Sequence, residues 1–225
     1  MKYGSIKGLV ARATRLDDVG KWVSGASGSA VSKGWIKIDF SGQSEAGTEY
    51  VQKNAAGELC INDKDADAFK GYDITIDFCN VDPELFELLA GVRVVEDYNG
   101  DVVGFAAGED IRLTGGFALE IWTQRANVGG YIYNLLGWVG SNSLGGDFTI
   151  EQAAATFQIK GRTKANTNWG RGPYDVVVVD GIGTAGKLDA PGLEDTEHIL
   201  QRVTTVAPPT APTDGGYTAQ LVAWS

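Results

Sequence analysis

The sequence is poor in the residues on which most enzymes and metal sites depend. Its 225 residues include a single histidine, His198, so neither a histidine pair nor an H-E-x-x-H motif can form. It also lacks the G-x-S-x-G sequence that presents an activated serine in many hydrolases. We therefore expect His198 to be a surface or hydrogen-bonded structural residue. We expect a protein that is not an enzyme, with no catalytic, cofactor-binding or metal-binding residues.

Cysteine and long apolar runs are scarce as well. The two cysteines, Cys60 and Cys79, lie in strand-like segments and do not form a C-x-x-C pair, which favours two buried, reduced thiols over a disulfide or a zinc site. No run of about 18 apolar residues is present, and the N-terminus lacks the apolar block of a signal peptide. We expect a protein that stays in the compartment of its synthesis and has no membrane partner.

Positive charge is scarce over most of the chain. Residues 1–40 carry seven basic and three acidic side chains, whereas residues 41–125 carry six basic and seventeen acidic ones. No basic run interrupts this acidic middle, which argues against tight binding to nucleic acid. The basic start of one copy could attract the acidic middle of another, or the charges could simply solvate the surface.

Three aspartates imitate the first half of a calcium-binding loop. Asp63, Asp65 and Asp67 have the required spacing, but Ala68 replaces the turn glycine and Ile74 replaces the bidentate glutamate. We interpret them as turn carboxylates rather than metal ligands.

A glycine-rich stretch imitates a phosphate-binding loop. Residues 181–187 (GIGTAGK) follow a strand-like run, as they do in nucleotide-binding proteins. Such loops deliver phosphate to a helix N-terminus, but Pro191 and Gly192 interrupt the segment that follows, and Leu188 replaces the Ser or Thr that would reach magnesium. We expect a surface loop; a nucleotide-dependent enzyme is the alternative that this motif leaves open.

Strands predominate in the predicted structure. Apolar and polar residues alternate clearly at 34–40 and 72–79, which is typical of half-buried strands. The polar stretch 42–56 suits a long loop or an extended hairpin. Further strands are predicted at 117–123, 131–138, 154–161, 174–179 and 199–206.

One short helix and one tight hairpin interrupt the strands. Asp82 is suited to the N-cap, Pro83 to the first turn and Gly91 to the stop, which predicts a helix over about 82–90. The Asn99-Gly100 pair predicts a hairpin turn between 92–96 and 102–105.

These elements predict an all-β protein, a β-sandwich or squashed barrel with one short helix, a long loop and extended termini. We divide the chain into an N-terminal arm at 1–32, a β-domain at 33–207 and a proline-rich C-terminal arm at 208–225. The alternating residues at 217–224 form a strand that either completes this chain's own sheet or docks on a neighbouring copy.

Aromatic residues leave another function open. Trp122, Tyr131, Tyr133, Trp138 and Trp169 could form the platform of a sugar-binding sandwich or adhesin. Core packing explains them more simply, and any on the outer face would suit a subunit interface.

Six segments carry a family resemblance that covers most of the chain. They resemble, in the same order, segments of the major tail (tail tube) proteins of long, non-contractile-tailed bacteriophages of the siphophage type. They are 9–20 (LVARATRLDDVG), 53–63 (KNAAGELCIND), 73–91 (DITIDFCNVDPELFELLAG), 145–151 (GGDFTIE), 169–176 (WGRGPYDV) and 203–209 (VTTVAPP).

The resemblance implies a structural virion protein, assembled in the host cytoplasm, whose six-membered rings stack into a tube that conducts genomic DNA. It also implies a tape-measure protein and a tail terminator as partners, with DNA passing through the lumen without specific binding. In such proteins a long loop and terminal arms tie one ring to the next, and the matching positions are about 41–56, 1–32 and 208–225. We expect these segments to be disordered before assembly.

Acidic residues that face the lumen would repel phosphate at short range. The candidates are Asp73 and Asp77, on the polar face of their strand, and Glu120 on a later strand.

Overall fold

The structure is a computed structural model, and it confirms the all-β sandwich with one short helix. It describes residues 5–25, 28–79, 82–106, 108, 115–126, 129–140, 148–150, 155–189, 192–210 and 218–219. The elements are β1 (Ser5–Arg15), β2 (Ser29–Ser32), β3 (Trp35–Glu45), β4 (Glu49–Lys53), β5 (Leu59–Lys64), β6 (Ala68–Phe78), α1 (Pro83–Ala90), β7 (Arg93–Glu96), β8 (Val102–Ala106), β9 (Phe117–Arg125), β10 (Tyr131–Gly140), β11 (Phe148–Ile150), β12 (Ala155–Thr163), a 3-10 turn (Thr167–Trp169), β13 (Val177–Val178), β14 (Ala185–Gly186), β15 (Ile199–Thr204) and β16 (Thr218–Ala219).

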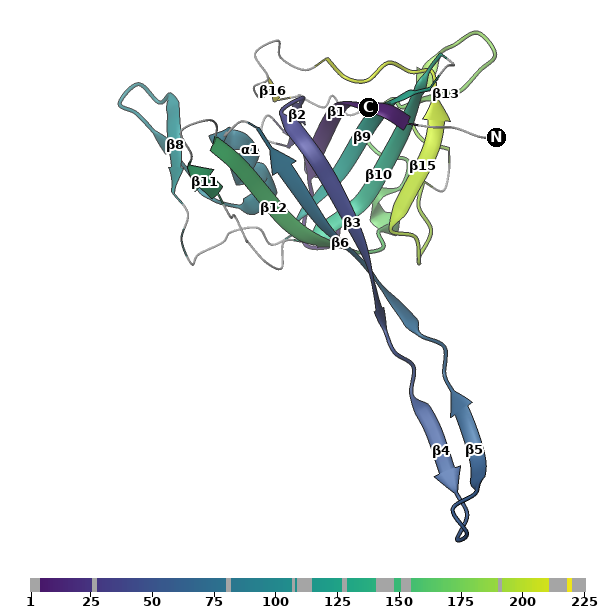
Figure 1. Cartoon of the computed structure of the whole chain (residues 1–225). Helices are drawn as coiled ribbons and strands as arrows, with labels where there is room; N and C mark the ends of the chain where they lie inside the picture. The colour runs from purple at the N-terminus through teal and green to yellow at the C-terminus, as the bar shows by residue number, and fades with distance from the viewer. Residues whose placement is uncertain are drawn as a thin grey trace.

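The main sheet is antiparallel and forks at β10. Its order is β16-β2-β1-β9-β10-β12-β6-β3, with β15 also beside β10 and β11 beside β12. The first part of β10, residues 131–136, pairs with β15, whereas only Val139 and Gly140 pair with β12. This short junction lets the sheet turn, so that β12, β6 and β3 form a second layer over β1, β9 and β10 (Figure 1).

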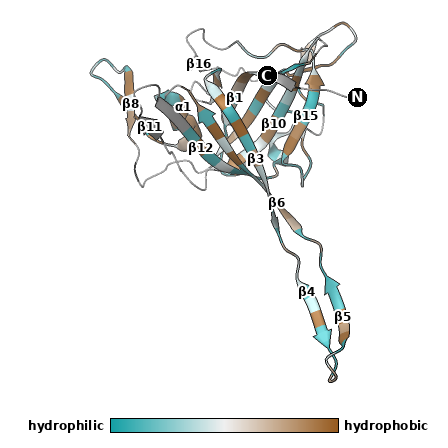
Figure 2. Cartoon of the chain, viewed as in Figure 1, coloured by the Kyte–Doolittle hydropathy of each residue, from teal (hydrophilic) through white to brown (hydrophobic). Residues whose placement is uncertain are grey.

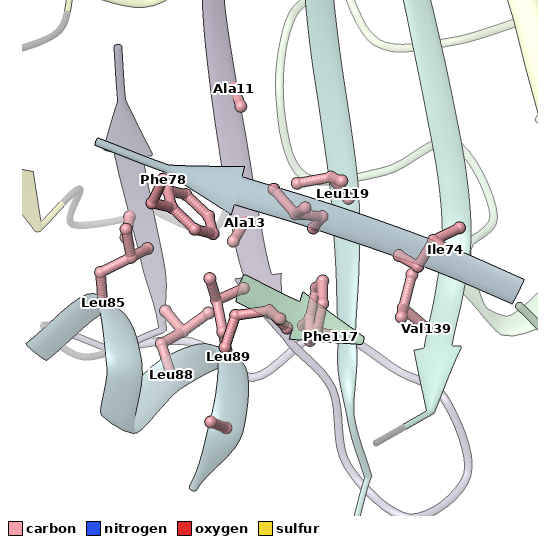
Figure 3. Close-up of a cluster of buried hydrophobic side chains, with 14 of the residues drawn as sticks. Ala11, Ala13, Ile74, Phe78, Leu85, Leu88, Leu89, Phe117, Leu119 and Val139 are labelled. Carbon is pink, nitrogen blue, oxygen red and sulfur yellow. The ribbon is translucent and has the colours of Figure 1, made fainter. Parts of the chain in front are cut away.

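The main core lies between the two layers, and α1 closes one end of it. Alternate residues of β9, Phe117, Leu119 and Ile121, point into this space, as alternation along a strand requires. Ile74 and Ile76 of β6 come from the facing layer. Figure 3 shows Leu85, Leu88 and Leu89 of α1 directed toward the strands.

A second core covers the opposite face of β1, β9 and β10. The other alternate residues of β9, including Ala118 and Trp122, pack there with Tyr133 of β10. The cover is largely irregular chain between the 3-10 turn and β15, which contributes Trp169, Val177, Leu188 and Leu193. Because both faces of these strands are buried, the first six residues of β9 are all buried instead of alternating between buried and exposed.

The helix prediction is confirmed in detail. Asp82 Oδ1 accepts hydrogen bonds from the backbone N–H groups of Glu84 at 3.0 Å and Leu85 at 3.2 Å, and Pro83 occupies the first turn. Gly91 ends the helix with φ of 68°, a left-handed conformation that glycine adopts without steric cost. The hairpin at Asn99-Gly100 is also confirmed, as β7 and β8.

The prediction of an N-terminal arm at 1–32 is wrong for the residues described. β1 lies well inside the sheet, between β2 and β9, and Val10, Ala13 and Leu16 are buried. The segment has few large apolar side chains, but small residues fit a crowded interior, so it gains from folding within the monomer. Residues 1–4 and 26–27 lie outside the described part of the chain.

One open alternative is decided and two further predictions change. At the C-terminus, Thr218 and Ala219 pair with β2, so these two residues extend the chain's own sheet; 211–217 and 220–225 lie outside the described residues. The strand expected at 174–179 shrinks to β13, because its partner β14 has only two residues. Both cysteines are free, as expected, but exposed rather than buried: Cys60 lies in β5, where every residue is exposed, and Cys79 follows the last residue of β6.

Exchanging Leu89 for alanine will test the main core. Its side chain is 1% exposed, so Leu89→Ala leaves a cavity and should lower the free energy of unfolding by about 2–5 kcal/mol. Leu59→Ala is the matched control, because Leu59 is 54% exposed, and its effect should stay within about 0.5 kcal/mol. Urea unfolding followed by tryptophan fluorescence measures both, and equal effects would contradict this description of the core.

Candidate assembly interface

A long hairpin projects from the body, formed by the ends of β3 and β6 and by β4 and β5 (Figure 1). Of the two interpretations of 42–56, a long loop or an extended hairpin, the hairpin is confirmed. The expectation that 41–56 is disordered before assembly is wrong, because in the single chain these residues contribute to the paired strands β3 and β4. Every residue of β4 and β5 is exposed. The tip is shaped locally: Asn54 Oδ1 accepts hydrogen bonds from the N–H groups of Ala56 at 3.0 Å and Glu58 at 2.8 Å, and Gly57 adopts φ of 84°.

The hairpin carries large apolar side chains that are exposed. Tyr50 lies opposite Asp63, and Gln52 lies opposite Ile61. Residues that lie opposite each other, or two apart without a register shift, share a face, so Tyr50 and Ile61 lie on the same face. Leu59 lies opposite Lys53, beyond a register shift that follows Gln52. We call Tyr50, Leu59 and Ile61 the hairpin stripe; they are 52%, 54% and 47% exposed. Figure 2 shows apolar colour on both strands of the hairpin, far from either core.

Nothing within the described monomer covers the stripe. A two-stranded ribbon is marginal in water unless its side chains pack against something else. The hairpin's ion pairs, Lys64 with Asp67 and Lys70 with Glu45, are about half exposed and contribute little. Residues 46–67 carry five acidic and two basic side chains, so the ribbon is also net negative.

The three aspartates of the calcium-like motif are turn and hairpin carboxylates, as interpreted. Asp67 Oδ1 accepts from the Gly47 N–H at 3.0 Å, and Asp65 Oδ2 accepts from the Tyr50 hydroxyl at 3.3 Å. Asp63 Oδ1 accepts from the next N–H, that of Lys64. Within the part of the chain described, no group of three His, Cys, Asp or Glu side chains could hold a metal ion.

His198 packs at the root of the hairpin. Its Nδ1 lies 2.9 Å from the hydroxyl of Thr163, and that hydroxyl also accepts the backbone N–H of Tyr72 at 2.8 Å. Phe69 contacts the imidazole edge-to-face, with ring centroids 5.2 Å apart. Gly71 fits between them with φ of 126°, since a Cβ there would lie 2.6 Å from the Thr163 carbonyl oxygen. The expectation of a hydrogen-bonded structural histidine is confirmed.

Strand β3 forms an open edge of the sheet. Among the residues described it pairs only with β6, so the other side of its backbone has no strand partner. Ile36 and Phe40 on this strand are 55% and 43% exposed. Long, unprotected edge strands are templates for pairing with another chain.

A groove lies at the end of the body opposite the hairpin. It has a volume of about 590 Å³ and lies where β1, β9 and β10 meet the segment that follows β15. Leu9, Tyr131, Pro208 and Pro209 give it apolar walls, and Lys33 and Arg125 give it positive charge. No carboxylate lines it, and within the described residues neither cation forms an ion pair.

Glu120 is not a lumen candidate, and this prediction is corrected. Its side chain is 1% exposed and accepts a two-pronged interaction from Arg12 on the neighbouring strand, at 2.5 and 2.7 Å. The Tyr133 hydroxyl donates to the same carboxylate at 2.8 Å, and Tyr174 covers the guanidinium 3.3 Å from its ring centroid. Alternation placed Glu120 on the second face of β9, but the irregular cover makes that face dry.

The burial of this network also acts on Tyr133. Desolvation, reinforced by the nearby negative charge of Glu120, raises the pKa of its hydroxyl well above the usual value. The hydroxyl therefore remains a hydrogen-bond donor, which is the role that the buried carboxylate requires.

Asp73 and Asp77 do lie on the polar face of β6. Asp73 forms an ion pair with Arg162 at 2.6 Å, which lowers the pKa of its carboxyl group, and Asp77 accepts from the Gln158 side chain at 2.8 Å. On the neighbouring β3, Lys37 forms an ion pair with Asp39. This face therefore mixes both signs of charge. Whether it faces a lumen remains a prediction.

The aromatic residues are part of the second core. Trp122, Tyr133 and Trp169 are at most 1% exposed, while Tyr131 and Trp138 are partly buried against the same cluster. The simpler interpretation, core packing, is confirmed. The platform on which the sugar-binding alternative depended is not exposed.

The glycine-rich stretch forms a surface turn. Asp180 Oδ1 accepts the N–H groups of Ile182 at 3.1 Å and Thr184 at 2.9 Å, and Ile182 is 91% exposed. No helix follows it in the described residues, and Leu188 instead enters the second core. The expectation of a surface loop is confirmed; Pro191 lies outside the described residues.

No protein-family model matches this chain, and no curated protein matches it significantly. Among the described residues, no helix is both long enough and apolar enough to cross a lipid bilayer.

The buried ion pair will be tested by breaking it and then removing it. Glu120→Leu leaves Arg12 charged in a dry environment and should lower the free energy of unfolding by about 3–5 kcal/mol. Adding Arg12→Met removes the stranded charge and should recover a large part of that loss. Urea unfolding measures the double variant and both single variants, Glu120→Leu and Arg12→Met. If the double variant were as unstable as both single changes summed, the pair would not be coupled.

His198 should titrate below the value of 6.5 for a free histidine, because burial lowers its pKa, opposed only by its hydrogen bond to Thr163. The neutral ring then favours the folded state above pH 6.5, and this contribution is lost as pH falls through the folded-state pKa. NMR titration of the single imidazole measures the shift, with the urea-unfolded chain as reference. A folded-state pKa above the reference would contradict the desolvated packing at the hairpin root.

Proposed function

We propose that this chain is a self-assembling structural subunit, a tail tube protein of the siphophage type whose rings stack into a DNA-conducting tube. The hairpin stripe is the observation that carries the proposal. A ribbon that projects three large apolar side chains into water gains stability only when another molecule covers it. The ordered resemblance of six sequence segments to tail tube proteins supports a second copy of this chain as that molecule.

The open edge of β3 supports lateral association in the same assembly. Pairing along an edge strand satisfies backbone groups without any sequence-specific pocket, and it repeats identically from copy to copy. Contacts that repeat head to tail close into a ring when the rotation closes, and otherwise advance into a filament. The chain thus offers one surface suited to a ring and another suited to stacking.

The net charge of −10 is compatible with a conduit for DNA. Phosphate is repelled by a negatively charged wall and held by a positively charged one, so a net acidic tube disfavours arrest of the genome in transit.

No structural observation favours the sugar-binding alternative, because its aromatic residues are in the core. Nothing favours the nucleotide-dependent alternative either, because no helix follows the glycine-rich turn among the residues that the structure describes.

Removal of the hairpin stripe will test the proposal. Purified protein at increasing concentration should form rings or tubes visible by negative-stain electron microscopy, with a matching rise in light-scattering mass. The variant Tyr50→Ser/Leu59→Ser/Ile61→Ser should lose stacked tubes. Its circular dichroism and unfolding midpoint should stay near those of the wild type, because all three side chains lie outside both cores.

A second exposed hairpin supplies the control. Tyr98 and Val103, in the turn of β7–β8 and on β8, are 94% and 62% exposed, so Tyr98→Ser/Val103→Ser removes comparable apolar surface elsewhere. This control should still assemble. Wild-type protein that stays monomeric at every concentration, or tubes that survive loss of the stripe, would overturn the proposal.

A further inference from the structure

We infer that the groove between Lys33, Arg125 and Pro208–Pro209 is the acceptor for the hairpin stripe of a second copy. This inference rests on the proposed assembly function and adds to it the surface that receives the hairpin. Three independent properties of the groove, its chemistry, its size and its position, select this occupant.

The chemistry of the two surfaces is complementary. The stripe face, which carries Tyr50 and Ile61, also presents Asp63, and the hairpin around these residues is net negative. The groove presents apolar walls with Lys33 and Arg125, and no carboxylate lines it. Charges arranged in this way direct docking and its register, while the apolar contacts provide the affinity.

The size of the groove suits a docked ribbon. Its volume of about 590 Å³ lies within the range of roughly 300–1,000 Å³ typical of clefts that enclose a ligand. Leu9, Tyr131 and Arg125 are only partly buried in the monomer, so a docked side chain would remove further apolar surface from water.

The position of the groove fits repeated stacking. It lies where Tyr131 pairs with Gln124 and Thr204, at one end of β10. The other end of β10, at Val139 and Gly140, joins the end of β12 that leads to the hairpin root beside Gly71 and Thr163. Donor and acceptor therefore lie at opposite ends of one molecule (Figure 1). A donor and an acceptor at opposite ends cannot satisfy each other in one copy, and they generate an open, head-to-tail series.

Site-specific cross-linking between two differently sized copies will test the inference. Both carry Cys60→Ser and Cys79→Ser, and one carries a purification tag so that the mixed dimer migrates separately. One copy has Gln52→Cys, on the stripe face, and the other has Gln124→Cys, at the rim of the groove. A short bismaleimide cross-linker should join them, and the mixed dimer should be the main product on denaturing gels.

Two matched controls test which face of the hairpin makes the contact and whether the groove receives it. Val51→Cys lies next to Gln52 on the opposite face of the hairpin, and Val103→Cys is exposed on β8, away from the groove. Either control should lower the yield of mixed dimer roughly tenfold or more, because its thiol points away from the contact. Equal yields from positions 51 and 52, or from positions 124 and 103, would overturn the inference.

A charge exchange gives a second readout. Arg125→Glu places like charges together and should lower the cross-linking yield roughly tenfold or more; Asp63→Lys on the donor should restore it. Tubes that form normally while neither cross-linking nor charge exchange responds would overturn the groove assignment and leave the proposed function intact. Protein that is monomeric throughout would overturn the proposed function, and the groove assignment with it.

Discussion

Burial of both faces of β1, β9 and β10 is the constraint from which the arrangement of the other elements follows. The inner faces of these strands need a second layer, so the sheet turns at the end of β10 and returns as β12, β6 and β3, with α1 closing the open end. The outer faces are covered by irregular chain that places Trp169 and Leu188 over β9. Arg12 and Glu120 face each other beneath that cover, and each is tolerated there only because the other is present.

The hairpin differs from these strands, because every residue of β4 and β5 is exposed. Beyond Gly71 its strands leave the core, and no second layer from the described part of the chain accompanies them, so the hairpin stripe faces water. A monomer can remove such surface from water only by folding back over it. The root makes that difficult, because Gly71, Thr163 and His198 are in close contact and hold the ribbon pointing away. A closely packed root and an unburied stripe together favour a partner outside the chain, and the proposed groove at the other end supplies one without any change of fold.

Much of the fold could be predicted from local patterns. Asp82, Pro83 and Gly91 defined the helix because capping depends on neighbouring residues, and Asn99-Gly100 defined its hairpin for the same reason. The polar, glycine-dotted stretch 42–56 was compatible with the extended hairpin that the structure contains. Predictions failed where a distant segment supplied the cover. Alternation placed Glu120 on the second face of β9, but it could not indicate that residues more than forty positions later keep water from that face.

The sequence by itself determined the all-β class, the strand faces, the single helix and the absence of a context for its nucleotide-like and calcium-like motifs, since these follow from periodicity and turn chemistry. Only the tertiary structure decided that β1 is an interior strand, that Glu120 is buried against Arg12, and that the stripe and the groove lie at opposite ends. Each of these depends on residues far apart in the chain, such as Leu9, Arg125 and Pro208 in the groove, or Gly71 and His198 at the hairpin root. Contacts of that range are set by how layers pack, which no local pattern specifies.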